Sequence, residues 1–208
     1  IPSEREICAQ YQVSRITVRE VLKDLEREGY FSRKQGKGTF VTLPKYVQKL
    51  NKFYSFREDM RKEGLKPSTT VLEFEEISCD NWLAGETGAA PGDKFFYITR
   101  LLMGGEEIYG YEISYIPADI VGAMSKEEIQ ENGLYHTIFL RSGLVGDDAT
   151  EIFEAVNCPQ NIALHLGIRK NDAIMKITRH TRAQGRFIEY CVSMMRGDRY
   201  RYHVNLNK

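Results

Sequence analysis

Val13-Ser14-Arg15-Ile16-Thr17-Val18-Arg19 is the stretch that decides the fold of the N-terminal part of this chain. Ser14 is a residue type that caps helix N-termini, and the apolar residues after it recur mostly at three- and four-residue steps. This spacing predicts a helix over residues 15–28, with a stop signal at Gly29. The expected apolar face consists of Ile16, Val18, Val21, Leu22 and Leu25.

Further signals around this helix complete a helix-turn-helix with a wing. Ser3 and Glu6 form a capping-box pattern, which predicts a short first helix that ends near Tyr11. Two β-prone runs, Tyr30–Arg33 and Thr39–Thr42, follow the second helix and are joined by basic and glycine residues. We expect a hairpin with a tip formed by Gly36, Lys37 and Gly38.

The residues at the start of the second helix are candidates for reading DNA. Arg15 and Arg19 stand four residues apart on one helical face, and an arginine fork can bind a guanine edge in the major groove. Ser14 and Thr17 lie in the first turn, where hydroxyls and main-chain amides can hold a phosphate. The alternative is that both arginines are solvated charges, with Arg19 paired to a nearby acid such as Glu20.

The charge of the chain is divided unevenly along its length. The 208 residues include 29 basic and 29 acidic side chains, but residues 1–45 hold nine basic and six acidic ones. The remainder is therefore net acidic. A basic module joined to a mildly acidic body fits a DNA reader that carries a separate regulatory domain.

The cysteines and the hydropathy pattern exclude several classes of protein. The four cysteines are far apart and form no C-x-x-C pair, so we expect no zinc ribbon or other metal site and a reducing cytoplasm as the location. No apolar run approaches the length that a membrane span needs, which is about 18 residues. We therefore expect a cytoplasmic protein without a membrane partner.

Beyond residue 50 the pattern predicts an α+β domain on a mostly antiparallel sheet. Residues 43–50 are expected to be a linker and residues 51–204 one domain, and Ser55 with Glu58 predicts a capped helix that ends near Gly64. The β-prone runs are Ser68–Ile77, Lys94–Met103, Glu107–Tyr115, Ala173–Gln184 and Arg186–Met195. Further helices are expected at Asp80–Thr87, Lys126–Glu131, Leu134–Arg141 and Gln160–Leu166.

Two of the expected hairpins repeat each other. Every matching pair of residues is offset by 79 positions. The pairs are Asp93 with Asp172, Ile98 with Ile177, Thr99 with Thr178, Arg100 with Arg179, Tyr111 with Tyr190 and Ser114 with Ser193. Six matches in register indicate a duplicated β-unit.

Four motifs occur together in residues 1–42. They are Pro2-Ser3-Glu4-Arg5-Glu6, Val13-Ser14-Arg15-Ile16-Thr17-Val18-Arg19, Leu25-Glu26-Arg27-Glu28-Gly29 and Gln35-Gly36-Lys37-Gly38-Thr39-Phe40-Val41. Together they resemble the DNA-binding domain of GntR-family regulators. The resemblance implies that Arg5, Arg15 and Arg19 contact bases or phosphates and that Gly36 brings the wing tip into the minor groove. It also implies a helix before Pro2, which we expect this domain to lack.

The second part of the chain carries motifs of its own. They include Ser55-Phe56, Ile98-Thr99-Arg100, Glu112-Ile113-Ser114-Tyr115-Ile116-Pro117 and Ile188-Glu189-Tyr190 leading to Arg196-Gly197-Asp198-Arg199-Tyr200. These resemble the UTRA ligand-binding domain of the HutC subfamily, which has a chorismate-lyase-like fold. The resemblance implies a small-molecule effector between the two halves of the sheet. The implied effector-binding residues are Phe56, Arg57, Arg100, Glu112, Tyr135, Arg141 and Glu189.

These residue types suit a polar or anionic effector, although each could instead be an outward strand charge or a core aromatic. Arg100 can fork onto a phosphate or carboxylate, and the two glutamates can accept from hydroxyls or an amine. Three positions depart from the family pattern, since Leu102, Gly133 and Met195 stand where relatives often carry arginine, serine and tyrosine. Arg57 replaces a frequent serine or threonine and could restore anion binding.

Three functions remain open from the sequence. The first is a homodimeric repressor that binds a palindromic operator and is released by an effector such as a sugar phosphate. The second is an enzyme like chorismate lyase, but the four histidines form no catalytic or ligand spacing and no nucleophile motif is visible, so we expect neither catalytic residues nor a cofactor. The third, an architectural DNA-binding protein, would leave the second domain unexplained.

Overall fold

The computed structural model describes residues 1–34, 38–42, 44–50 and 53–206. The chain forms two compact units, Ile1–Val47 and Gln48–Lys208, and each is described by itself. The boundary between them falls inside the expected 43–50 linker, although strand β3 (Tyr46–Lys49) occupies part of that range. Within the described residues, no helix is both long and apolar enough to cross a membrane.

The first unit contains the expected helix-turn-helix and hairpin. Its elements are α1 (Glu4–Tyr11), α2 (Arg15–Arg27), β1 (Phe31–Lys34) and β2 (Gly38–Val41). Both halves of the capping box between Ser3 and Glu6 are present. Gln12 takes the left-handed conformation (φ 54°) that ends α1 and turns the chain toward α2.

The buried stripe of α2 is narrower than the sequence pattern predicts. Val18 and Leu22 are buried, at 4% and 9% exposure, and Leu25 is half-buried. Ile16 and Val21 are exposed, so their expected place on the apolar face is wrong. Helical geometry explains Ile16, which lies about 200° around α2 from Val18. Val21 lies on the same side of α2 as Val18 and Leu25, yet it is exposed in the described part of the first unit.

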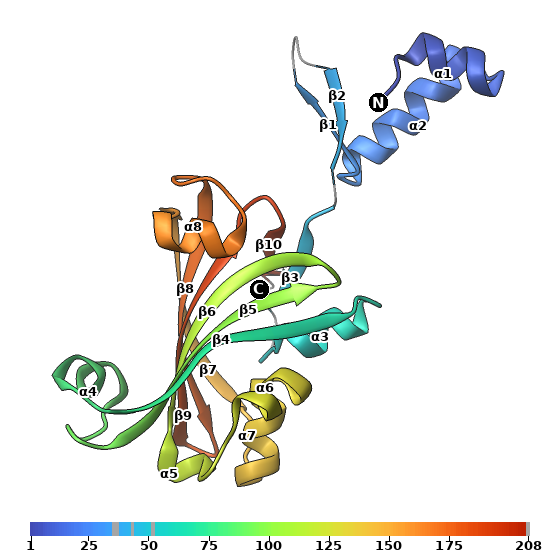
Figure 1. Cartoon of the computed structure of the whole chain (residues 1–208). Helices are drawn as coiled ribbons and strands as arrows, with labels where there is room; N and C mark the ends of the chain where they lie inside the picture. Colours follow the sequence, from blue (N-terminus) through green and yellow to red (C-terminus); the bar gives the residue numbers. More distant parts are fainter. Residues whose placement is uncertain (35–37, 43, 51–52, 207–208) are drawn as a thin grey trace. The chain divides into compact units, whose positions relative to one another are not determined.

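The second unit is built on one antiparallel sheet of six strands in the order β4-β5-β6-β9-β8-β7 (Figure 1). The strands are β4 (Pro67–Ser78), β5 (Lys94–Gly104), β6 (Glu107–Pro117), β7 (Asp148–Asn157), β8 (Ala173–Ala183) and β9 (Arg186–Arg196). The helices are α3 (Phe56–Lys62), α4 (Asn81–Thr87), α5 (Ala118–Val121), α6 (Lys126–Asn132), α7 (Leu134–Ser142) and α8 (Gln160–Leu166). Strand β3 pairs with β10 (Tyr200–His203) in a separate small sheet.

The predicted duplication is larger in the structure than the two hairpins. Strand, helix and hairpin follow in the same order in β4-α4-β5-β6 and in β7-α8-β8-β9. The turns before β5 and β8 also match, because the Cys79 and Cys158 amides donate to the main-chain oxygens of Asp93 and Asp172. In the sheet the two halves meet at the β6–β9 pair.

The two faces of the sheet are covered by different helices. Side chains on one face of β6, such as Tyr111 and Tyr115, pack under α8 and α4, which lie toward opposite ends of the sheet in Figure 1. The alternate side chains of the same strand point to the other face, where Ile116 joins the core formed with α5, α6 and α7. Ile98, Ile129 and Ile138, each at 0% exposure, are the centre of that core.

Three elements of the second unit and one cap differ from the sequence prediction. The prediction missed β7, α5 and β10, which are an edge strand, a helix of four residues and a strand of four residues. The expected capping box at Ser55 is wrong, since the Ser55 side chain makes no capping hydrogen bond to α3. Ser55 instead lines a pocket.

Candidate functional site

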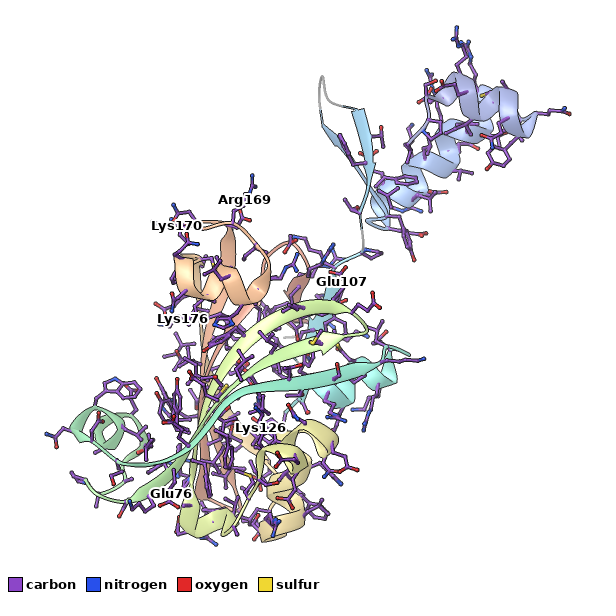
Figure 2. All side chains as sticks on the ribbon, viewed as in Figure 1. Glu76, Glu107, Lys126, Arg169, Lys170 and Lys176 are labelled. Atoms are coloured by element: carbon purple, nitrogen blue, oxygen red, sulfur yellow. The ribbon has the colours of Figure 1, made fainter. Side chains whose placement is uncertain are left out.

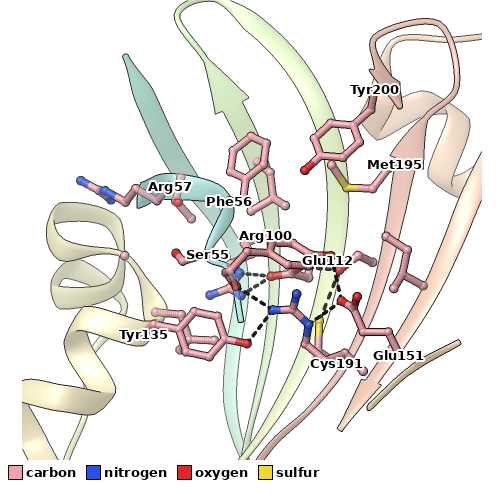
Figure 3. Close-up of a pocket in the computed structure, with 18 of the residues that line it drawn as sticks. Ser55, Phe56, Arg57, Arg100, Glu112, Tyr135, Glu151, Cys191, Met195 and Tyr200 are labelled. Carbon is pink, nitrogen blue, oxygen red and sulfur yellow. Dashed lines mark hydrogen bonds and ion pairs between the residues drawn. The ribbon is translucent and has the colours of Figure 1, made fainter. Parts of the chain in front are cut away.

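The pocket lies on the face of the sheet that carries α6 and α7, and its empty volume, including the open mouth, is about 650 Å³ (Figure 3). Strands β5, β6, β8 and β9 form its floor, and the segment before α3 and the start of α7 form its walls. Charged and hydroxyl groups are contributed by Ser55, Arg57, Thr69, Arg100, Glu112, Glu151, Arg179 and Ser193. Aromatic and apolar groups come from Tyr54, Phe56, Leu102, Leu134, Tyr135, Ile177, Met195, Tyr200 and Tyr202.

Arg100 and Glu112 form a buried ion pair in the floor of the pocket. The two residues face each other across β5 and β6, and their side chains are 5% and 12% exposed. Arg100 Nε donates to Glu112 Oε1 at 2.9 Å, and a second bond runs from Nη2 to the same oxygen. Burial alone would raise the pKa of Glu112, but Arg100 and the hydroxyl of Ser193 hold this pKa below its usual value.

Glu189 of β9 lies next to this pair, and its carboxylate accepts hydrogen bonds from hydroxyl groups. Ser114 Oγ donates to Glu189 Oε1 at 2.9 Å, while Tyr135 Oη donates to Oε2 at 2.5 Å and Thr181 Oγ1 to the same oxygen at 3.3 Å. Arg100 Nη2 in turn donates to Ser114 Oγ at 3.3 Å. A carboxylate that is 1% exposed is therefore held by four donors or charges rather than by solvent.

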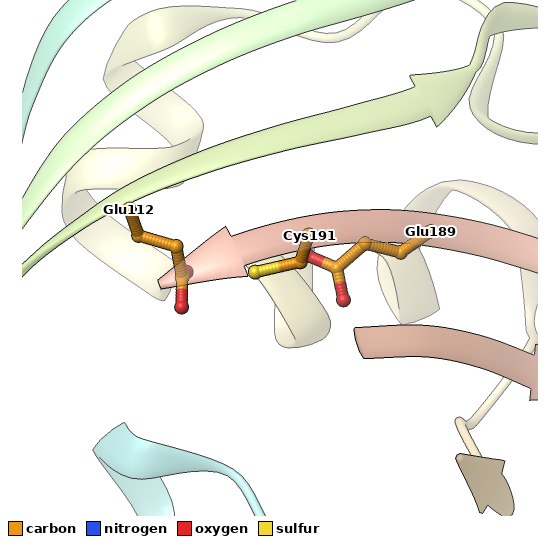
Figure 4. Close-up of side chains that lie close together, drawn as sticks. All are labelled: Glu112, Glu189 and Cys191. Atoms are coloured by element: carbon orange, nitrogen blue, oxygen red, sulfur yellow. The ribbon is translucent and has the colours of Figure 1, made fainter. Parts of the chain in front are cut away.

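Glu112, Glu189 and Cys191 bring their side-chain ligand atoms within 4.8 Å of one another (Figure 4). Such a trio could in principle hold a metal ion. Both carboxylates are already bound by Arg100 or by hydroxyls, and burial raises the pKa of Cys191 well above its ordinary value. A metal ion at this trio would have to displace Arg100 and the hydroxyl groups that already bind the two carboxylates.

Arg179 is a pocket residue that the sequence analysis did not select. Its Nε donates to Glu151 Oε1 at 2.7 Å, and its Nη1 donates to Tyr135 Oη at 3.1 Å and to the main-chain oxygen of Tyr54 at 3.2 Å. The side chain is 10% exposed. Arg179 is the repeat equivalent of Arg100, so the internal repeat was the signal that could have identified it.

Arg57 lines the pocket but is engaged by the main chain. Its guanidinium donates to the main-chain oxygens of Gln130 and Glu131, which belong to the last turn of α6. The side chain also crosses Gly133, where an added Cβ would lie 2.7 Å from Arg57 Cδ. Arg57 therefore fills the space that a side chain at position 133 would use, and these bonds compete with any anion.

The structure gathers most of the other implied effector residues. Phe56 lines the pocket and stacks near Tyr200, with ring centres 6.2 Å apart. The three departures from the family pattern, Leu102, Gly133 and Met195, all line the pocket as well. Arg141 is not brought there: it lies six residues beyond Tyr135, about 240° around α7, and pairs with Glu128 of α6 instead.

Four of the implied DNA-binding residues lie together in the first turns of α2: Ser14, Arg15, Thr17 and Arg19. The Ser14 hydroxyl accepts from the Thr17 amide at 3.1 Å, which confirms Ser14 as the cap. Arg15 is exposed, and Arg19 is 65% exposed and paired with Glu4 of α1 at 2.9 Å rather than with a neighbour on its own helix. Arg5 is exposed on α1.

The wing tip can be described only in part. Gly38 begins β2 with a φ of 102°, a left-handed value that favours glycine. Gly36 and Lys37 lie outside the described residues.

Comparison with known proteins identifies the family of each part. Residues 1–41 match the model of the bacterial regulatory proteins of the gntR family, and residues 62–201 match the UTRA domain. The chain belongs to the GntR family and carries a UTRA domain. It is 32% identical over 203 residues to the HTH-type transcriptional repressor NagR of Bacillus subtilis (strain 168), covering 97% of this chain and 83% of that protein.

Two further similarities support the assignment. The mannosyl-D-glycerate transport/metabolism system repressor MngR of Escherichia coli (strain K12) is 24% identical over 97% of this chain and 84% of its own length. The crystal structure of PhnF from Mycobacterium smegmatis superposes with a TM-score of 0.78 at 26% identity, covering all of this chain and 91% of that one. The matched family and relatives are DNA-binding transcriptional regulators, so the regulator reading is confirmed over the enzyme alternative.

Proposed function

We propose that this GntR-family regulator acts in the cytoplasm as a homodimeric repressor, which binds a palindromic operator and is released by a small polar or anionic effector. The observation that carries the effector role is the pocket itself, where Arg100 and Arg179 face Glu112 and Glu151 among tyrosine rings. Such a lining combines a few directed polar groups with apolar walls, as small-molecule sites do.

The DNA-binding half of the proposal is supported by the exposed start of α2. Arg15 and Arg19 stand four residues apart on one helical face, and Ser14 and Thr17 belong to the capped first turn. A dimer would present two such helices to two half-sites about one helical turn of DNA apart. Arg19 is held by Glu4, which limits the rotamers from which its guanidinium can reach a phosphate or base.

The charges of the pocket bear on the class of effector. Arg100 and Arg179 are each paired with a carboxylate. Nη1 and Nη2 of Arg57 are bound by the end of α6, whereas its buried Nε has no hydrogen-bond partner among the described residues. A ligand that carries hydroxyls together with one anionic group can exchange for these partners one at a time. The name of the relative MngR connects that protein to mannosyl-D-glycerate, a sugar derivative that bears a carboxylate. We propose that the effector of this chain is a sugar derivative with one anionic group, either a carboxylate or a phosphate.

Thermal denaturation of the full chain with mannosyl-D-glycerate, glucose 6-phosphate and inorganic phosphate tests the effector role. A ligand at a hundredfold excess over its Kd stabilises the folded state by about 2.7 kcal/mol, which is a readily measured shift. We expect a shift with at least one sugar derivative that disappears in Glu112→Gln. A shift that survives this substitution would place the ligand outside the pocket.

A gel-shift titration with genomic fragments tests the DNA-binding role and separates repressor from architectural protein. We expect a few fragments to be retained in the presence of excess competitor DNA, because direct base readout gives sequence preference. Equal retention of all fragments would favour the architectural alternative.

A further inference from the structure

Arg179 connects the pocket to the chain segment that leads from β3 into α3. Its Nη1 donates to the Tyr54 main-chain oxygen, and its guanidinium carbon lies 4.1 Å from the centre of the Tyr54 ring and 5.7 Å from that of Phe53. Cation–π contacts are strongest where the cation is shielded from water, as it is here at 10% exposure. The Arg179 side chain therefore contacts two consecutive residues of the segment, Phe53 and Tyr54.

Other contacts of the same segment also end on pocket residues. The Tyr54 hydroxyl donates to Glu151 Oε1 at 2.8 Å, and the Phe53 ring meets the Tyr135 ring edge-on at 5.6 Å. Phe53 is seated against Gly146, where an added Cβ would lie 2.5 Å from the ring. The segment Phe53–Ser55 is thus anchored on Arg179, Glu151 and Tyr135, and all three of these residues line the pocket.

The start of the second unit is fixed on both sides of this segment. Gln48 of β3, at 1% exposure, accepts from the Tyr200 hydroxyl at 2.8 Å and donates to Asp59 of α3 at 2.9 Å. Because β3 and α3 are held in this way, Phe53–Ser55 is the part of the connection whose anchoring depends on Arg179.

The repeat equivalent of Arg179 does not make such contacts. Arg100 is bound inside its own hairpin, by Glu112 and Ser114 of β6. Arg179 faces Cys191 at the position equivalent to Glu112, and a thiol gives a guanidinium no charged partner. Arg179 instead reaches the edge strand β7, helix α7 and the segment before α3.

We propose that Arg179 is the positioning residue that couples occupancy of the pocket to the anchoring of the segment Phe53–Ser55, and through β3, which lies between this segment and the first unit in the chain, to operator binding. The Nη1 group is shared between Tyr54 and Tyr135, so a hydroxyl, carboxylate or phosphate oxygen of a ligand that binds Arg179 competes with the Tyr54 carbonyl. Losing that bond weakens the anchoring of the segment that follows β3, and a resulting shift of β3 changes the spacing at which a dimer holds its two α2 helices. This proposal rests on the proposed function as an operator-binding dimer.

Two variants and one matched control test the coupling in the full chain. Arg179→Gln removes the cation, and Tyr54→Leu removes the ring and hydroxyl while it keeps the Arg179–Glu151 pair. The second variant matters because Arg179→Gln leaves Glu151 without its partner and could lower stability. The control is Lys176→Gln, which removes the cation of another β7–β8 pair, Lys176 with Glu154 at 2.8 Å, on the opposite face of the sheet. Figure 2 labels Lys176 on the second unit.

The first measurement is hydrogen–deuterium exchange of peptides that cover residues 53–57. Both variants should exchange at least about tenfold faster there than the wild type, while the control stays at the wild-type rate. Unchanged exchange in both folded variants would overturn the proposal, since Arg179→Gln removes the bond to the Tyr54 main-chain oxygen and Tyr54→Leu removes the ring and hydroxyl contacts.

The second measurement is operator affinity on duplexes whose half-site spacing is varied by single base pairs. The wild type should prefer one spacing by about tenfold or more, and both variants should bind it more weakly and lose most of the preference. If Arg179 and Tyr54 had only a structural role, the variants would lose affinity by the same factor for operators of every spacing. If the variants exchange faster but keep the wild-type preference for one half-site spacing, the coupling to operator binding is wrong while the proposed function stands. If the wild type binds no operator, the proposed function itself is wrong.

Discussion

Ile113 of β6 lies directly opposite Val192 of β9, and these two residues are equivalent positions of the internal repeat. An approximate two-fold axis through this pair therefore exchanges the two halves of the sheet. It carries Arg100 onto Arg179 and places one arginine from each half in the pocket. The two arginines differ in their partners because the position of Glu112 is taken by Cys191 in the second half.

Gly197, in the turn between β9 and β10, should tolerate no side chain. An added Cβ would lie 2.6 Å from the main-chain oxygen of Ala173, which cannot move without disturbing β8. Gly197→Ala should lower the free energy of unfolding by about 1–3 kcal/mol, the usual cost of overpacking. Gly85→Ala in α4 is the control, since its Cβ would meet nothing within 4 Å and alanine favours helices by about 0.5–1 kcal/mol. Denaturant titration of both variants checks the prediction, and equal stabilities would contradict it.

The Arg100–Glu112 pair should make stability depend on acid pH. The folded state holds the pKa of Glu112 below its ordinary value of 4.5, so the carboxylate stabilises the fold above that value and the contribution is lost as pH falls through the lower folded pKa. Glu112→Gln should destabilise the protein at pH 7 by about 3–5 kcal/mol, because Arg100 then lacks its charged partner. The gap between variant and wild type should narrow below about pH 4.5, as thermal unfolding at a series of pH values would show. A gap that stays constant across this range would mean that Glu112 does not titrate as described.

Arg57 and Gly133 should be energetically coupled. Gly133→Ala places a Cβ 2.7 Å from Arg57 Cδ and strains a φ of +82°, so the substitution should be costly in the wild type. In an Arg57→Ala background the contact is absent and only the backbone strain remains. The double-mutant cycle should therefore give a coupling of about 0.5–3 kcal/mol, measured by denaturant unfolding. Additive effects would show that Arg57 moves aside freely.

The arginines of α2 should differ in how they bind DNA. Arg15 is exposed and should read bases, so Arg15→Ala should cost about 1–3 kcal/mol on the operator and little on unrelated DNA. Arg19 is held by Glu4, and Glu4→Gln should weaken binding less than Arg19→Ala does. Anisotropy titrations on operator and scrambled duplexes separate the two effects. An Arg15→Ala loss that is equal on both duplexes would assign Arg15 to phosphate contact.

The sequence predicted the parts of the fold whose residues carry strong local patterns. The long hairpins of the sheet are runs of about eleven residues rich in β-branched and aromatic side chains, and the capping box of Ser3 and Glu6 specifies where its helix starts. β7 was missed because an edge strand buries little: Ile152 is 55% exposed and Phe153 37%, so no buried face shows in its pattern. Ile16 was misplaced although its spacing already puts it on the side of α2 opposite Val18 and Leu22.

The candidate site was predictable where a motif and a strand coincide. Arg100, Glu112 and Glu189 lie on regular strands, and their alternation brings them to one face. Arg141 lies outside the pocket lining because helical periodicity places it about 240° around α7 from Tyr135, a relationship that the sequence itself shows. The contacts of Arg179 with Tyr54 join residues 125 positions apart in the chain and follow only from the tertiary packing.

The most direct test of the account is the binding of full-length protein to its selected operator with and without the sugar derivative that raises its melting temperature most. We predict an inverted-repeat sequence bound by two chains, with affinity lowered at least about tenfold by the ligand, which corresponds to a coupling of about 1.4 kcal/mol. Binding without sequence preference, or an operator affinity that the saturating ligand leaves unchanged, would contradict the account.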